Sequence, residues 1–257
     1  MSHTALRRVV IRLLHDPELA RALAADAAQA LAGIDLTPDE VRALATVPAA
    51  AWRTDPDRPR RVLAALCEEF AAATALAPAR TARFFSSPHF HRAVQERGSL
   101  AAALAAHLAD DDDARVVELA RLEGAIARAR RAPRCERPGA PGTLRLSSAV
   151  DVLTVRDGAT TLLQAMRAGT PPNELGRGSV DVLVVRQPSG EVTLEDVEPA
   201  LAALLRDARS ASSRDRLVAR ARTHGADPGE AEAAVDALVA DGLLVRCDML
   251  ARSEPAS

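Results

Sequence analysis

Apolar residues recur at every third or fourth position over most of the first half of the chain, which is the spacing that places them on one face of a helix. The first such set is Leu6, Val9, Val10, Leu13 and Leu14. Asp16 is a capping residue, and Pro17 after it suits the first position of a helix. This pair predicts a second helix that runs to Gly33. We therefore expect residues 1–133 to form a helical domain.

Short polar motifs divide this half into further helices. Thr37 and Glu40 have the spacing of a capping box, which marks the start of a helix. Asp55-Pro56 and Arg58-Pro59 predict a loop. Ser87-Pro88 and Gly98-Ser99 each predict the end of one helix and the start of the next. A longer helix after the loop is expected to carry Val62, Leu63, Leu66, Phe70 and Ala73. The later helices are expected at residues 100–108 and 113–131.

The pattern changes after residues 134–142, a segment rich in proline and glycine that we interpret as a linker. Beyond it, stretches rich in β-branched residues predict strands. These stretches are residues 143–147, 150–155 and 180–185. Pro188-Ser189-Gly190 then predicts a hairpin turn between residues 180–186 and 191–194.

Three helices and a closing strand are expected after the hairpin. The helices are predicted at residues 199–208, 214–223 and 228–240, and Gly242 ends the last of them before an extended segment. A hairpin, three short helices and a closing strand are typical of a winged helix. The predicted fold class is α+β and mainly helical, with an N-terminal helical domain over 1–133 and a small winged-helix-like domain with a β-hairpin over 143–250.

Composition excludes several classes of protein. The formal net charge of −2 gives no overall field that would attract nucleic acid or anionic lipid. The three cysteines are too few and too widely spaced for a disulfide framework or a zinc site. No apolar run approaches the roughly 18 residues of a membrane span, and the N-terminal stretch is broken by Arg12 and lacks a signal-peptide cleavage site. We expect a cytoplasmic protein with neither a membrane nor a nucleic acid as its partner.

Few reactive side chains lie in a useful arrangement. His89 and His91 are the closest histidine pair, but at a helix start their rings point apart, and no carboxylate or thiol completes a metal site. The four aspartates at 110–113 are interpreted as the acidic start of a helix, and Cys67 as a small buried hydrophobic residue. Trp52 is either a core anchor or an exposed contact. With no nucleophile elbow and no phosphate- or dinucleotide-binding motif, we expect no catalytic residue, metal site or cofactor in this chain, and predict that it is not an enzyme.

Three segments occur in the order and spacing of one protein family. They are ARLEGAIARA at 120–129, LRLSSAVDVLTVRDG at 144–158 and VDVLVVRQPSGEVTLEDVEPALAALL at 180–205. This order resembles the partner proteins of the multinuclear non-haem iron oxidases that modify ribosomally made peptides, a family that includes the methanobactin-pathway partner subunit. The resemblance implies a non-catalytic subunit that forms a heterodimer with the oxidase, binds the leader of a precursor peptide and presents that peptide for modification. The iron would belong to the partner enzyme, and the helical domain would dock that enzyme.

The last third also resembles the peptide-recognition element of such pathways, as in the small pyrroloquinoline quinone chaperone. In that element a leader peptide adds as a strand beside the third strand and packs against the third helix. The matching positions are Glu191, Val192, Thr193 and Leu194 on the strand and Ala231, Ala234, Val235 and Leu238 on the helix. An open strand edge supplies unpaired N–H and C=O groups, and small helix residues would leave a groove for leader side chains. The alternative is that these helix residues pack on neighbouring helices.

Two other functions stay open. A winged-helix transcriptional regulator would need basic residues on its recognition helix, but the helix expected at 228–240 has no arginine. The preceding helix could still contact phosphates, through Arg214, Arg216, Arg220 and Arg222. Residues 15–40, HDPELARALAADAAQALAGIDLTPDE, resemble the small helical subunit of the protocatechuate-type extradiol dioxygenases. That resemblance leaves the strands of the last third unexplained.

Overall fold

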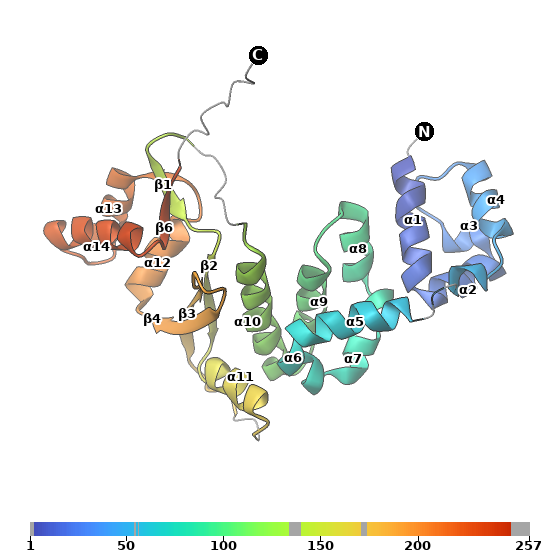
Figure 1. Cartoon of the computed structure of the whole chain (residues 1–257), viewed down its shortest axis with the longest axis horizontal. Helices are drawn as coiled ribbons and strands as arrows, with labels where there is room; N and C mark the ends of the chain where they lie inside the picture. The colour runs from blue at the N-terminus through green and yellow to red at the C-terminus, as the bar shows by residue number, and fades with distance from the viewer. Residues whose placement is uncertain (1–2, 54, 56, 134–139, 171–173, 248–257) are drawn as a thin grey trace, which may run out of the picture. The chain divides into compact units, whose positions relative to one another are not determined.

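The computed structural model describes residues 3–53, 55, 57–133, 140–170 and 174–247, and these have an α+β fold that is mainly helical, as predicted (Figure 1). The chain divides into two compact units. The first contains residues up to 124 together with 166–169, and the second contains 125–165 and the residues from 170 onward. The division lies inside helix α10 (Ala114–Arg131) and precedes the expected linker, of which residues 134–139 lie outside the described part of the chain.

The last turns of α10 belong to the second unit because their polar groups bond there. Arg128 of α10 forms an ion pair with Asp151 at 2.7 Å. Arg186 donates a hydrogen bond of 2.6 Å to the carbonyl of Ala132, just beyond the helix end. The boundary that proline and glycine content predicted, after residue 133, therefore lies about ten residues after the boundary that packing defines, after Gly124.

The first unit consists of short helices, several of which begin at polar caps. Asp16 accepts hydrogen bonds from the backbone N–H groups of Glu18 and Leu19, and Thr37 and Glu40 form the predicted capping box. Ser87 and Ser99 also cap helices, as expected. The elements are α1 (His3–His15), α2 (Pro17–Ala25), α3 (Ala27–Ala30), α4 (Pro38–Thr46), η1 (Ala51–Arg53), α5 (Arg58–Glu69), α6 (Ala71–Leu76), α7 (Pro78–Ala82), η2 (Phe84–Ser86), α8 (Pro88–Glu96), α9 (Leu100–Ala109) and the start of α10.

Two helices that the sequence predicted as continuous are interrupted. Asp26 ends α2 and caps α3 through a 3.0 Å bond from the N–H of Gln29, because a short polar side chain competes with the helix for backbone groups. Phe70 separates α5 from α6. Arg58 and Pro59, expected in a loop, form the first turn of α5, where proline lacks only a donor that a helix start does not use.

Among the described residues, two groups of apolar side chains help to hold the first unit together. One joins the helices up to α4 through Val9, Leu13, Ala20, Leu23, Leu31 and Leu44, and Trp52 packs against it. The other is aromatic: the rings of Phe84, Phe85 and Phe90 lie 5.1–5.6 Å apart in tilted or edge-on pairs. Because Trp52 is partly buried and packs against the first of these groups, it lies at the edge of the core.

The second unit contains two antiparallel three-stranded sheets. One is a meander in the order β2-β3-β4, formed by β2 (Val150–Arg156), β3 (Ser179–Arg186) and β4 (Val192–Val197). Helix α11 (Ala159–Ala168) follows β2 and was not predicted, although Ala159, Leu162 and Leu163 are buried at helical spacing. The hairpin between β3 and β4 is the predicted one.

The other sheet belongs to the winged-helix-like part and has the order β5-β1-β6. It is formed by β1 (Thr143–Leu146), β5 (Ser212–Ser213) and β6 (Leu244–Cys247), with α12 (Pro199–Asp207), α13 (Arg214–Thr223) and α14 (Pro228–Ala240) between them in the chain. The three helices begin and end within one residue of their predicted bounds. The hairpin expected to be the wing, β3 with β4, lies in the meander and not in this sheet. The central strand of this sheet is β1, which pairs with β5 and β6.

One core serves both sheets of this unit. Val150, Val152 and Leu183 of the meander belong to the same buried cluster as residues of the three helices. The helix residues are Ala202, Leu204, Leu205, Leu217, Val218, Ala221, Ala231, Val235 and Leu238. The meander thus packs against the three helices through this shared core, with β4 as its outer strand.

Candidate functional site

Strand β4 is an edge of the meander, because within the described part of the chain β3 is its only strand neighbour. The turn that precedes it has Gly190 at φ +93°, a conformation that glycine adopts without strain. The N–H of Gln187 donates to the carbonyl of Glu191 at 2.7 Å and closes the hairpin. Sequence and turn together fix the register of β4 on β3 from Val192 to Val197.

The register determines which backbone groups of β4 face outward. In an antiparallel pair, hydrogen-bonded pairs alternate with pairs that are not bonded to each other. Since Gln187 and Glu191 form a bonded pair, the backbone groups of Val192, Leu194 and Asp196 point away from β3. Three N–H and three C=O groups therefore line the free edge.

The opposite edge of the meander, on β2, is covered by side chains. The N–H of Val152 donates to its neighbour Asp151 at 2.9 Å, and the Val152 carbonyl accepts from Arg209 at 2.7 Å. Arg209 and Arg128 also hold the Asp151 carboxylate from two sides, at 2.9 and 2.7 Å. Of the two edges, β4 is the one whose backbone is left for another strand.

The predicted strand residues and the predicted helix residues have different surroundings. Val192, Thr193 and Leu194 are half-buried on β4, and Glu191 is exposed immediately before it. On α14, however, Ala231, Val235 and Leu238 are buried in the core, and only Ala234 is partly exposed. The main neighbours of α14 are α13 and β6. The α14 face therefore packs on its neighbours, which was the alternative interpretation, and does not line a groove beside β4.

The surface around β4 is acidic. Glu191, Glu195, Asp196 and Glu198 are all exposed. Sequence reasoning identified the strand but overlooked this charge, although the run EVTLEDVE contains it. A chain segment laid along this edge would meet four carboxylates within eight residues.

A cavity of about 520 Å³ lies at the end of β4 and is lined by Thr154, Asp181, Asp196 and Glu198 among others. Arg206 of α12 donates hydrogen bonds to Asp181 and, at 2.7 Å, to Thr154. The hydrogen bond from Arg206 holds the pKa of Asp181 below its ordinary value, although burial opposes this. Asp181 is thus already paired, and Asp196 and Glu198 supply the negative charge that faces solvent.

The histidine pair is divided between separate contacts. His89 bonds to Asp110 at 2.7 Å, and His91 bonds to Asp16 at 3.2 Å. Among the described residues, no three potential ligands are grouped closely enough to hold a metal ion. Cys67, expected to be buried, is half-exposed on α5.

Helix α14, which would be the recognition helix of a DNA-binding protein, has the wrong charge for that role, whereas Arg216 and Arg222 of α13 are exposed. Arg214 of α13 is paired with Asp236 of α14 at 2.8 Å. The exposed side of α14 carries Glu232 and Asp236 and no basic residue. Such a surface would repel the phosphate backbone.

Neither the helices nor the comparisons with known proteins assign this chain to a class of protein. None of the helices within the described ranges has both the length and the apolar composition of a membrane span. No protein-family model matches the chain, and no curated protein matches it.

Proposed function

We propose that this chain is a non-catalytic partner subunit that binds the leader of a precursor peptide and presents that peptide to a multinuclear non-haem iron oxidase. The observation that carries the proposal is the open edge of β4, where Val192, Leu194 and Asp196 direct their backbone groups outward. An extended peptide can pair with these groups whatever its side chains are, which suits a subunit that must hold one segment and leave another free to react. The segment resemblances over 120–205 agree with this role.

The charge of the edge indicates which leaders would bind. Glu195, Asp196 and Glu198 make the rim acidic, so a leader with arginine or lysine in its paired segment would be attracted and oriented. The cavity beside Asp196 and Glu198 has room for one such side chain. Because the carboxylates are exposed, their contribution would be largest at low ionic strength.

The remaining parts of the proposal concern the enzyme. The oxidase would carry the iron and perform the reaction, and the helical first unit would dock it in a cytoplasmic heterodimer. The chain itself would bind and position the peptide without turning it over.

The proposal is tested by co-expression of the tagged chain with an iron oxidase and precursor peptide encoded beside it. We expect the oxidase to co-elute in equal amount with the chain, and the peptide to gain its modification only when all three are present. Mass spectrometry of the peptide measures the second result. Full modification without this chain, or failure of the chain to associate with the oxidase, would refute the proposal.

A further inference from the structure

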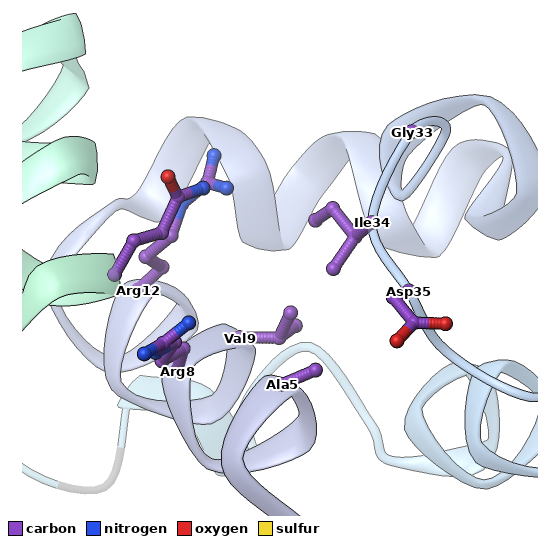
Figure 2. Close-up of a pocket in the computed structure, with 8 residues that line it drawn as sticks. Ala5, Arg8, Val9, Arg12, Gly33, Ile34 and Asp35 are labelled. Atoms are coloured by element: carbon purple, nitrogen blue, oxygen red, sulfur yellow. The ribbon is translucent and has the colours of Figure 1, made fainter. Parts of the chain in front are cut away.

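A second site lies in the first unit, unrelated to the β4 edge. A pocket of about 230 Å³ is lined by α1, by the residues that follow α3, and by Gln95 of α8. Figure 2 shows Arg8 and Arg12 at one end, Asp35 at the other, and Val9 and Ile34 between them. One liquid water takes up about 30 Å³, so the pocket suits a small organic molecule and is too small for a cofactor.

The cationic end of this pocket is incompletely bonded. The Nε atoms of Arg8 and Arg12 are both buried and have no hydrogen-bond partner within the described chain. Arg12 makes one contact through its terminal nitrogen, 3.2 Å from Nδ1 of His91. Arg8 has no ion pair among the described residues. Two guanidinium groups one helical turn apart on α1 therefore face the pocket with donors to spare.

The charge of Asp16 does not fully compensate the burial of Arg12. Burial lowers the pKa of Arg12, and the attraction of Asp16 offsets this only in part. Asp16 itself is committed to capping α2 and to its bond with His91. An anion in the pocket would supply the missing compensation, since guanidinium groups match planar carboxylates.

The rest of the lining limits which anion fits. Val9 is buried and Ile34 is half-buried, and they form an apolar middle section. Asp35 at the far end would repel a second negative group. We propose that this pocket binds a small organic monocarboxylate, with its carboxylate at Arg8 and Arg12 and a short branched aliphatic body on Val9 and Ile34.

The test titrates isovalerate into the full chain and follows binding by ligand-observed NMR and calorimetry. We expect saturable binding with a Kd of about 1 mM or tighter, given the few atoms of the ligand. Arg8→Gln should weaken binding about tenfold or more, because it removes a charged donor. Arg7→Gln is the matched control: Arg7 is exposed on the same helix, does not line the pocket, and should leave the affinity unchanged.

Two further probes separate the chemistry from general anion binding. The neutral analogue 3-methylbutan-1-ol should not bind, and inorganic phosphate should bind more weakly than isovalerate because it cannot use Val9 and Ile34. The comparison of these probes needs only the natural chain, so it holds even if Arg8→Gln fails to fold. Absence of saturable isovalerate binding up to about 20 mM, an unchanged affinity in folded Arg8→Gln, or equal binding of phosphate would each overturn the proposal.

Discussion

Glu123 of α10 is the most informative position for testing how the first unit is held together. Its two carboxylate oxygens accept hydrogen bonds of 3.0 Å each from the backbone N–H groups of Ala72 and Ala73, in the first turn of α6. The side chain is 1% exposed, and Ala72 and Ala73 are 3% and 0% exposed. Glu123 therefore caps, from about fifty residues away, a helix whose own sequence provides no cap.

The expected cost of Glu123→Ala follows from those contacts. Two buried donors lose their acceptors where water cannot reach them, at about 1–3 kcal/mol each. The cavity left by the side chain adds to this cost, whereas loss of the desolvation penalty of the carboxylate reduces it. We expect the free energy of unfolding of the first unit to fall by about 2–5 kcal/mol.

Urea unfolding followed by tryptophan fluorescence measures this change, because Trp52 is the only tryptophan of the chain and lies in the first unit. Glu68→Ala is the control, since Glu68 is exposed on α5 and its loss should change the stability by no more than about 0.5 kcal/mol. If Glu123→Ala costs no more than Glu68→Ala, the helix start is not held by Glu123 and the reasoning is wrong.

The pH dependence gives a second test of the same residue. Burial raises the pKa of Glu123 above its ordinary value of 4.5, although the bonds from Ala72 and Ala73 oppose this. A raised native pKa means that the contribution to stability is complete below the unfolded pKa and is lost as the pH rises through the native one. The stability of the natural chain relative to Glu123→Gln, which does not titrate, should therefore decrease as the pH rises above about 4.5. An increase over that range would contradict the assignment.

Three further predictions concern single contacts. Asp16 is buried, but its hydrogen bonds from His91 and the α2 backbone hold its pKa below 3.8. The natural chain should therefore be more stable than Asp16→Asn at neutral pH, and this difference should shrink as the pH falls below about 4. Acid titration of the unfolding midpoint of both chains measures the change. Gly176→Ala should cost about 1–3 kcal/mol in urea unfolding, because the new Cβ would lie 2.9 Å from the Cβ of Asp157; an unchanged midpoint would show that the loop yields freely. Thr37→Ala removes the capping box of α4 and should cost about 1 kcal/mol, whereas Thr37→Ser should cost little, and equal losses would argue against the cap.

Sequence reasoning succeeded where the signal is local. Helices α12, α13 and α14 were predicted to within a residue because each begins at a polar or proline-bearing start and ends near a glycine or a turn. The hairpin before β4 was predicted for the same reason, from Pro188-Ser189-Gly190. The α+β class follows from the change of period after residue 142.

The failures come from contacts between distant residues. The start of α6 after Phe70 is capped by Glu123, which no local pattern connects to α6. The groove expected at Ala231, Val235 and Leu238 came from the resemblance to a peptide-recognition element, with packing on neighbouring helices as the alternative. The structure places these three residues in the core, and the sequence of α14 alone does not say what packs on its apolar face. Helix α11 had a readable signal in the spacing of Ala159, Leu162 and Leu163, but it is only ten residues long. The separation of the strands into two sheets follows from pairings such as Leu146 with Leu244, which lie far apart in the chain.

The central claim is that a leader peptide pairs with the free edge of β4, and Val192→Pro tests it most directly. The N–H of Val192 points away from β3, so proline removes a donor from the free edge and leaves the β3–β4 hydrogen bonds in place. Calorimetric titration of a synthetic leader peptide should give micromolar or tighter binding to the natural chain and to Val192→Ala, and binding at least about tenfold weaker to Val192→Pro. Equal affinity of a folded Val192→Pro, or no binding of the leader to the natural chain, would contradict the account.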